Sequence, residues 1–397
     1  MKKLLPALAL STALALAGCS GFFVSQNPGG GSGGGGGSTT SGFFYILNAT
    51  TSQLVGYQVT TGKLSALGNA TEPVSGPTSL AISPNDAYLY VGTVNGIYYY
   101  SISSAGALTA GNNGAVITSI VPQSMQVDAT NGWLIVVPQA TAQVNAIPLN
   151  TTTGNYSGGT IVTAPLTAAT PTQMVITPDN NHIFVALGTN GTDEIPFSAT
   201  GATTLGTGNN LPVYYNVNGT TGSATALAVD PNTKFLYIGE TLAYTANSTT
   251  NPGGLRVFTI SSSANTITEV SGSPFASGGI GPSAILADHT GNYVYIANRT
   301  VNAQTLGNIA GYSILSNATG STVSLTPLTN SPYTAGVTTY ALAEDNSYSF
   351  VMAVNAGGSP DLDVYTFDTT NAGALDNTIS TSTGTDPTGA FAIAAAH

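Results

Sequence analysis

The sequence predicts an all-β protein, a seven-bladed β-propeller closed by pairing of its N- and C-terminal strands in one blade. Three observations lead to this prediction. A strand–turn–strand pattern recurs about every 50 residues, as in "PTSLAISPNDAYLYV" from Pro77 and "PSAILADHTGNYVYI" from Pro282. The strands are short, β-branched and aromatic, and no long stretch has the 3.6-residue period of a helix. The first and last units are incomplete in complementary ways.

Each repeat contains the elements of a four-stranded meander. A strand of small residues ("TSLAIS") precedes a turn of Pro, Asn, Asp and Gly, and an aromatic-led strand follows ("YLYVG", "FLYIG", "YVYIA"). A third strand ("GIYYYSI", "LRVFTI") and a ragged fourth ("GALTA") complete the unit, which is typical of a propeller blade. A β-solenoid is the alternative, but it would have shorter and more uniform turns. The aligned units start at Pro77, Pro122, Pro171, Ala224, Pro282, Thr339 and Pro387.

The two ends of the repeat region complement each other. After Pro387 only "PTGAFAIAAAH" remains, which supplies one inner strand, whereas "FFYILN" and "LVGYQV" within 43–59 match second and third strands. Joining these pieces gives seven blades and removes the exposed sheet edges that promote aggregation. We therefore predict that the chain ends share a blade.

The N-terminal segment has the features of an export signal. Lys2 and Lys3 precede an uncharged apolar run that is too short to cross a bilayer, and small residues follow it. "LAGC" resembles the lipobox of bacterial lipoproteins, which implies that Cys19, the only cysteine, is acylated and becomes the first mature residue. Residues 1–18 are then a signal peptide; a buried N-terminal helix is the alternative. We expect a lipid-anchored protein of the cell envelope, and Ser20 favours the outer membrane by analogy.

The domain boundaries follow from composition. Residues 19–42 include a Gly/Ser tract that cannot bury apolar area and should act as a flexible tether. Residues 43–397 form the predicted propeller. Only 6% of all residues are charged and the net charge is −11, which argues against nucleic acids or anionic lipid surfaces as partners because both require clustered Lys or Arg. We expect a monomer without cofactor, attached to the membrane by its lipid alone.

The repeats resemble those of the seven-bladed propeller lactonases, the family of propeller-type 6-phosphogluconolactonase and muconate cycloisomerase relatives. The resemblance covers most of the chain from Phe43 onward. It is carried by "PDNNHIFV", "DPNTKFLYI" and "TGNYVYIANRT", the last of which is similar to the family's "PDGRFLYVSNRG". The resemblance implies the fold, but a fold hosts many functions.

The meander topology predicts where a ligand would bind. The start of the first strand and the end of the second lie on the same rim, so these positions form two rings around the mouth of the central channel. From these rings and their neighbours we select six candidate binding residues, whose amides, hydroxyls and one aromatic ring suit a carbohydrate, a sugar lactone or an envelope protein. They are Asn48, Thr93, Gln139, Asn298, Tyr340 and Asn355.

The same rings contain one possible catalytic pair. Lactone hydrolysis needs a base that activates water and a donor for the oxyanion, and the rings offer Glu240 and Arg299. The resemblance implies a histidine and further arginines at this rim, but the entry ring has no histidine. The family's Asp-Arg is matched by Asp193-Glu194, and Glu240 falls one residue before the family's glutamate position. Only Arg299 and Asn298 match in place.

Other polar residues have mainly structural interpretations. His182 and His289 are expected on the opposite rim, where they cap or pack, and the aspartates that end the first strands should accept turn N–H bonds. Asp361 and Asp363 share one strand face and could hold calcium, but two carboxylates are weak evidence, so we predict no metal site. The aspartates of the turns are Asp128, Asp230, Asp288 and Asp345.

Three functions remain open at this stage. The leading hypothesis is a binding module that uses a neutral channel mouth, and whether the protein is an enzyme is left undecided. The alternative is a propeller-type lactone hydrolase with Glu240 as base and Arg299 as oxyanion donor. The third is a surface structural protein whose flat faces contact other envelope components.

Overall fold

The computed structural model describes residues 42–60, 63–201, 204–214, 221–242, 253–261, 266–301, 306–316, 322–381 and 388–397. The predicted signal peptide, Cys19 and the glycine tether therefore lie outside the described residues. The described part is almost entirely β: it contains one short 3-10 helix, η1 (Asn112–Gly114). None of its helical segments has the length and apolar character needed to cross a bilayer. The all-β prediction is confirmed.

The described strands form six sheets of antiparallel pairs. Four of these sheets are four-stranded meanders, in which each strand pairs with its sequence neighbour except at the chain ends. Their strands are β29 (Ala390–Ala395), β1 (Gly42–Asn48), β2 (Gln53–Thr60) and β3 (Lys63–Pro73); β4 (Pro77–Ile82), β5 (Tyr88–Thr93), β6 (Gly96–Ile102) and β7 (Leu108–Ala110); β8 (Pro122–Val127), β9 (Trp133–Pro138), β10 (Gln143–Pro148) and β11 (Val162–Pro165); and β12 (Gln173–Ile176), β13 (His182–Ala186), β14 (Thr192–Pro196) and β15 (Asn209–Leu211).

The remaining two sheets are larger than a single repeat. One contains β16 (Ser223–Val229), β17 (Phe235–Thr241), β18 (Gly253–Ser261) and β19 (Thr266–Glu269), with β20 (Phe275–Ala276) paired to β18. The other has eight strands, which are β21 (Ile280–Ala287), β22 (Tyr293–Thr300), β23 (Leu306–Ser316), β24 (Val323–Pro327), β25 (Tyr333–Glu344), β26 (Phe350–Gly358), β27 (Leu362–Phe367) and β28 (Leu375–Thr381).

The eight-stranded sheet departs from the expected set of separate four-stranded units. Residues 312–316 of β23 pair with β24, whereas residues 306–309 pair with the beginning of β25. β25 then continues to pair with β26. Two successive repeats are merged because the returning chain runs along the third strand before it becomes the first strand of the next repeat.

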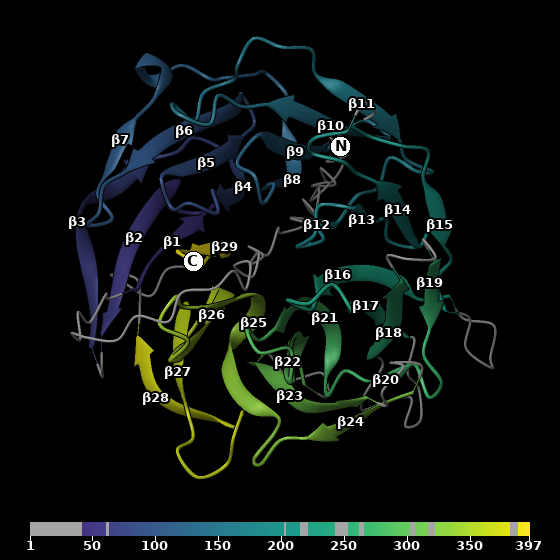
Figure 1. The fold of residues 1–397 in the computed structure, drawn as a ribbon. Helices are drawn as coiled ribbons and strands as arrows, with labels where there is room; N and C mark the ends of the chain where they lie inside the picture. The colour runs from purple at the N-terminus through teal and green to yellow at the C-terminus, as the bar shows by residue number, and fades with distance from the viewer. Residues whose placement is uncertain are drawn as a thin grey trace, which may run out of the picture.

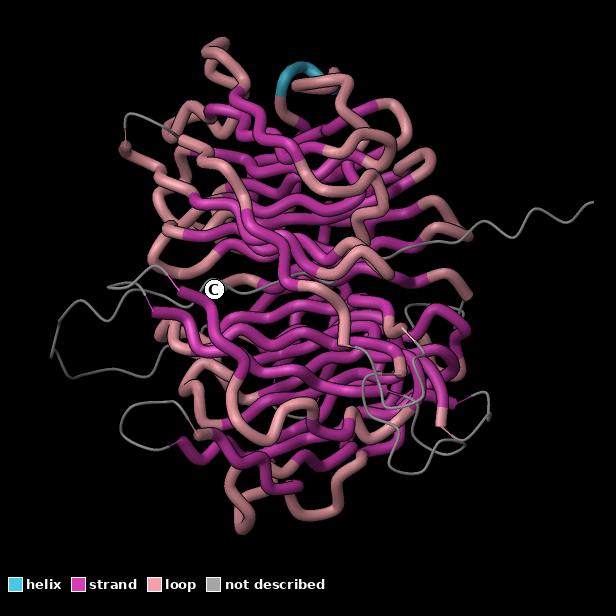
Figure 2. Tube along the Cα trace, turned by 90° about the vertical axis from the view of Figure 1, so that its right-hand side faces the viewer, coloured by secondary structure: helices cyan, strands magenta, loops and turns pink. Residues whose placement is uncertain are grey.

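The sheets follow one another around a centre (Figure 1). The first strands contact each other in the order β4, β8, β12, β16, β21 and β25; β25 contacts β29, and β29 contacts β4. Viewed from the side, the strands run across the molecule and the turns gather on two opposite faces (Figure 2). These faces are the two rims on which a ligand site could be built.

The last described strand lies in the same sheet as the first. β29 pairs with β1 over Phe44↔Ala395 to Asn48↔Ala390, and it supplies the inner strand of the sheet that β1, β2 and β3 continue. Phe391 and Ile393 are buried there, at 3% and 0% exposure. The pairing of the opening and closing segments that the sequence predicts is therefore present as a strand ladder.

The apolar core lies between successive sheets. Aromatic residues of the second strands fill it: Tyr237 and Tyr295 are fully buried, and one cluster joins Tyr237 of β17 with Ile285 and Ile296 of β21 and β22. The small residues of the first strands, such as Ala226 and Ala228, belong to the same cluster. At the interface between sheets, the first strands thus contribute small residues and the second strands contribute large aromatic residues, as the repeat pattern predicts.

An aspartate holds each of four turns between first and second strands. The carboxylate of Asp288 accepts the N–H of Tyr293 at 2.7 Å, as expected for a residue that terminates a strand in a tight turn. The equivalent aspartates accept the corresponding N–H groups at 2.5 to 2.7 Å, which confirms the predicted structural role. These pairs are Asp128 with Trp133, Asp230 with Phe235 and Asp345 with Phe350.

Hydroxyl groups at the start of three first strands connect successive repeats. Each donates to the carbonyl oxygen of the residue that begins the next repeat, at 2.6 to 3.2 Å. The start of the first strand is one of the predicted ring positions, yet the hydroxyls found there hydrogen-bond within the protein framework. The three bonds run from Thr172 to Ala224, from Thr225 to Pro282 and from Ser283 to Thr339.

Candidate functional site

Glu240, the predicted base, is a buried ion-pair partner. Glu240 is the penultimate residue of β17 and is 0% exposed. Oε1 accepts a hydrogen bond from Nη1 of Arg256 at 2.8 Å, and Oε2 accepts the backbone N–H of Tyr214 at 2.8 Å. Arg256 lies on the adjacent strand β18, where Glu240↔Gly254 and Ile238↔Arg256 are register pairs. The carboxylate therefore has its charge and both oxygens satisfied within the fold.

Arg256 also binds a second carboxylate. Its Nε and Nη2 donate to Glu269 at 2.9 and 2.7 Å, and Nη1 donates to the carbonyl oxygen of Pro212 at 2.7 Å. The guanidinium lies over the ring of Phe258, 4.8 Å from its centroid. A bidentate pair with a planar stack is the geometry that arginine favours. Sequence reasoning gave Arg256 no role, although a lone cation in an apolar strand was a signal that it needs buried anions.

The charge of Arg256 influences the pKa values of both carboxyl groups that it contacts, Glu240 and Glu269. Burial raises the pKa of Glu240, while the positive charge of Arg256 acts in the opposite direction. Burial would also raise the pKa of Glu269, but hydrogen bonds from Arg256 and Ser273 lower it overall. The charge of Arg256 thus compensates the buried carboxylate of Glu240 and the partly exposed carboxylate of Glu269.

Arg299, the predicted oxyanion donor, lies elsewhere, on β22. Its guanidinium carbon is 4.9 Å from the ring centroid of Tyr340, on β25 of the next repeat. Tyr340 occupies the position at which Ser283 and Thr225 carry the hydroxyls that link successive repeats. Arg299 takes part in none of the ion pairs of the described residues. The cation that Glu240 contacts is therefore Arg256.

Four of the predicted binding residues are buried at the ends of second strands. Asn48, Thr93, Asn298 and Asn355 are at most 4% exposed, and each bonds to local backbone or to a third strand. The Asn355 amide, for example, donates to the carboxylate of Asp363 at 2.9 Å. Gln139 is exposed, and Tyr340 is buried beneath Arg299. The buried amides and hydroxyls of Asn48, Thr93, Asn298 and Asn355 therefore form the layer directly beneath the rim surface, which we call the floor of the rim.

Several polar atoms of this floor have no hydrogen-bond partner within the described residues. Buried polar groups are nearly always satisfied by protein or by bound solvent, so these enclosed atoms mark positions where bound water is expected. One of them is Nε of Arg299. At or beside the predicted rim, the unpaired atoms belong to Asn48, Thr78, Asn298, Arg299, Thr339 and Asn355.

His182 and His289 pair with glutamates near the opposite rim, and His397 pairs with Asp86. Nδ1 of His182 lies 2.8 Å from Glu194, and Nδ1 of His289 lies 2.9 Å from Glu344. Burial raises the pKa of Glu344 to about 7, although the contacts with His289 lower it. The first interaction also explains Glu194, which stands where the resembled family has arginine. These pairs support the predicted structural role of the histidines.

The two carboxylates considered for calcium are used within the fold. Asp363 accepts the Gly336 N–H at 3.0 Å in addition to the Asn355 amide, and Asp361 is 0% exposed. No group of three or more metal-ligating side chains occurs among the residues that the structure describes.

Comparisons with solved structures identify the fold. A candidate 6-phosphogluconolactonase from Bacteroides uniformis has a TM-score of 0.66 at 16% identity, covering 90% of this chain and 100% of that chain. The periplasmic gluconolactonase of Pseudomonas aeruginosa has a TM-score of 0.63 at 14% identity, covering 90% and 99%. A β-propeller domain from Myceliophteria thermophila has a TM-score of 0.52 at 14% identity, covering 79% and 87%.

These likenesses show that the chain has the β-propeller fold of lactonase-like proteins. Identities this low show the fold alone and do not transfer an activity. No family model matches the chain, and no curated protein matches it by sequence.

Proposed function

We propose that this protein is an exported, lipid-anchored propeller that binds a sugar-like ligand at its channel mouth without chemical turnover. The single observation that carries the proposal is that Glu240 is held in a buried ion pair, whereas Arg299 has no carboxylate partner among the described residues. Glu240 is neutralised by Arg256 and fully buried, whereas Arg299 stacks on Tyr340 and keeps an unpaired Nε donor. The rim thus offers a donor without an adjacent free base.

The ligand class follows from the groups around Arg299. A guanidinium with an unpaired N–H attracts a carbonyl, ring or carboxylate oxygen. The side chains of Asn298, Thr339 and Asn355 behind it are neutral and fully buried, so they add no charge that would favour a free ion. A sugar lactone, a sugar acid or the end of a glycan meets both requirements, and an envelope protein that presents such groups is the corresponding macromolecular partner.

The proposed architecture is a closed ring of seven blades. The eight-stranded sheet counts as two blades, because β21 to β24 and β25 to β28 each repeat the four-strand order of the other sheets. The β1–β29 ladder and the contact of β29 with β4 support closure. Closure fixes the rim positions relative to one another, which a binding site built from several blades requires.

Lactone hydrolysis is the second candidate function, and Arg299 favours it. This residue matches the resembled family in place, and its guanidinium forms no ion pair with a described carboxylate. Glu240 would be the base only if it left Arg256. The two candidates therefore differ in one property, which is whether Glu240 becomes free when the ligand binds.

The test measures binding and turnover on the same protein. We expect calorimetry to detect binding of a gluconolactone or gluconate, and replacement of Arg299 by alanine to weaken it about 10-fold or more, because a charged hydrogen bond is lost. We expect no hydrolysis of gluconolactone above the uncatalysed rate.

Lys234 provides the matched control, because its ammonium lies 4.9 Å from the Phe235 centroid at a turn away from the rim. Lys234→Ala should bind like the wild type. Turnover that both Glu240→Gln and Arg299→Ala abolish, in variants with unchanged melting temperature, would establish the hydrolase instead. Absence of both binding and turnover would reject both candidates.

The proposed envelope location is tested through Cys19. In a bacterial host, the full chain is expected in the membrane fraction and to incorporate labelled palmitate, because acylation at Cys19 would be its anchor. Cys19→Ala should remove the label and move the protein to the soluble fraction. Membrane retention of the unlabelled variant would contradict the proposed anchor.

A further inference from the structure

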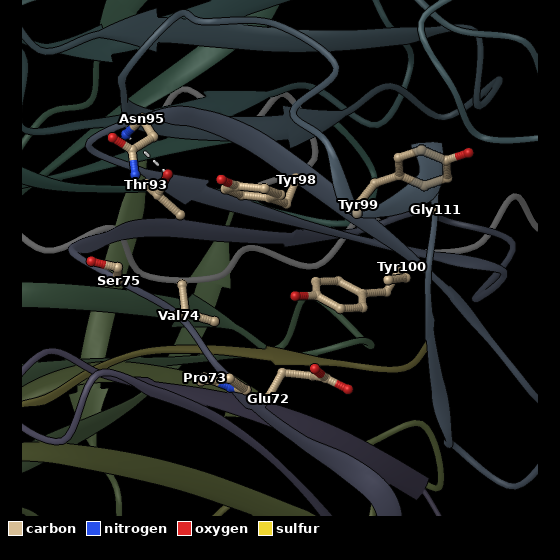
Figure 3. Close-up of a pocket in the computed structure, with 12 residues that line it drawn as sticks. Glu72, Pro73, Val74, Ser75, Thr93, Asn95, Tyr98, Tyr99, Tyr100 and Gly111 are labelled. Carbon is tan, nitrogen blue, oxygen red and sulfur yellow. Dashed lines mark hydrogen bonds between the residues drawn. The ribbon is translucent and has the colours of Figure 1, made fainter.

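A cavity lies at the boundary between the sheet of β1–β3 and the sheet of β4–β7, and its lining includes the predicted rim residue Thr93. Its volume is about 350 Å3. Its lining comes from the end of β3 and the following segment, from the β5–β6 turn, and from β6 and β7. Figure 3 shows the side chains that surround it. None of the residues assigned to the Arg299 site lines it.

The sequence "GIYYYSI" builds the aromatic side of this cavity. Successive side chains of a strand point to opposite faces, so Tyr98 and Tyr100 share one face of β6 and Tyr99 takes the other. Tyr99 packs against the ring of Tyr90, with centroids 6.1 Å apart, in the next interface. Tyr98 and Tyr100 lie one above the other with their hydroxyls pointing the same way (Figure 3).

Tyr98 and Tyr100 combine an apolar ring with an available polar end. Tyr100 is 8% exposed and belongs to the core cluster of the adjoining sheets, and Tyr98 packs against that cluster. Within the described part of the chain, neither hydroxyl has a hydrogen-bond partner. The packed core therefore holds the rings in place while their hydroxyls remain available.

The rest of the lining is polar and carries one charge. Glu72, Ser75 and Asn95 contribute a carboxylate, a hydroxyl and an amide. Glu72 forms no ion pair with any described cation. Thr93 is engaged, since its hydroxyl donates to the Gly96 carbonyl oxygen at 2.9 Å. The cavity thus presents donors and acceptors around two aromatic rings.

We propose that this cavity binds a neutral sugar ring, with its C–H face against Tyr98 and Tyr100 and its hydroxyls bonded to Glu72, Ser75 and Asn95. Ligand sites combine apolar and aromatic walls with a few placed polar groups, and a sugar ring has the matching two-sided character. A carboxylate accepts two sugar hydroxyls, while an amide both donates and accepts.

The charge of the lining selects against anionic ligands. None of the lining residues is basic, and Glu72 would repel a phosphate or a carboxylate. Burial, together with the charge of Glu72 and the neighbouring Tyr98, raises the pKa of Tyr100 to about 12, so its hydroxyl stays a donor at neutral pH. A quaternary ammonium would use the rings and Glu72 but leave the amide and hydroxyls unused.

The test is a binding series with defined probes. By saturation-transfer NMR and calorimetry, we expect the protein to bind neutral oligosaccharides of glucose, galactose or N-acetylglucosamine more tightly than choline or gluconate. Tyr98→Ala should weaken this binding at least 10-fold. Glu72→Gln and Tyr100→Phe should each weaken it about 3- to 10-fold, because each loses one hydrogen-bonding function.

Two comparisons make the result specific. Tyr348→Phe alters an exposed tyrosine that is not part of this lining and should leave saccharide affinity unchanged, as should Lys234→Ala, which alters a cation outside the lining. Melting temperatures identify variants that fail to fold, and Tyr100→Phe keeps the ring that packs in the core. Failure of all three sugars to bind, stronger binding of choline, or wild-type affinity in Tyr98→Ala and Glu72→Gln would each overturn the proposal.

Discussion

Replacing Arg256 with leucine is expected to lower the free energy of unfolding by about 3–5 kcal/mol at pH 7, the usual cost of removing one partner from a buried ion pair. The substitution leaves Glu240, which is 0% exposed, without its cation. It also frees Glu269 and removes the donor to the carbonyl of Pro212. Urea unfolding, followed by circular dichroism, measures the change.

The same variant should become more stable relative to the wild type as the pH falls. Burial already raises the pKa of Glu240 in the folded state, and Arg256 opposes that rise. Without Arg256 the folded-state pKa rises further above the unfolded value, so the folded state binds the proton more tightly. The stability that proton binding by Glu240 gives the variant is then fully present at low pH. This contribution is lost as the pH rises from about 4.5 towards the new pKa of Glu240. The deficit of Arg256→Leu should therefore be smaller at pH 4.5 than at pH 7.

A double variant separates this cause from a loss of packing. Replacing Glu240 and Arg256 together by Gln and Leu removes the buried charge, and we expect it to recover part of the stability lost in the single variant. Lys234→Leu, which removes a surface cation, should change stability by less than about 0.5 kcal/mol. A pH-independent deficit, or a double variant no more stable than Arg256→Leu, would contradict the proposed role of the ion pair.

The fold was more predictable than the site because it depends on pattern rather than on individual contacts. The alternation in "GIYYYSI" and the small residues of "TSLAIS" specify strands and their faces, and the structure has β6 and β4 at these places. The merged sheet was not predictable from this pattern. It depends on how β25 returns along β23, where Asn308↔Thr334 and Ile309↔Tyr333 pair, and the lengths of connecting segments do not encode such a path.

The sequence predicted on which strands the site residues lie, but it did not predict which side chains they bond to. Topology puts Glu240 and Arg299 at the ends of second strands, as predicted. Topology does not show that the carboxylate of Glu240 forms its ion pair with Arg256. This arginine lies two residues beyond Gly254, the register partner of Glu240. The ring of first-strand residues has the same limitation: Thr225 and Ser283 are at the predicted positions, but their hydroxyls bond to the next repeat. Side-chain partners depend on the spacing between blades, which a single repeat does not specify.

Removing residues 388–397 is expected to abolish cooperative folding, because the segment completes the sheet of β1. It takes away Phe391 and Ile393, which are buried between neighbouring sheets, and it exposes the paired edge of β1. Exposed edges also promote aggregation. The graded version is Ile393→Ala, which should cost about 2–5 kcal/mol as a large-to-small core substitution.

Rescue by a peptide distinguishes ring closure from a general loss of apolar contacts. A synthetic peptide with the sequence of residues 388–397 can add to the free edge of β1 as a strand, since main-chain hydrogen bonds supply affinity and buried side chains supply register. It should restore a cooperative thermal transition and far-UV circular dichroism of the shortened chain, whereas a peptide of the same composition in scrambled order should not. If the shortened chain alone melts at the wild-type temperature, the strand does not close the ring. Equal rescue by both peptides would mean that residues 388–397 stabilise the protein only by burying apolar surface and not by pairing with β1 in a specific register.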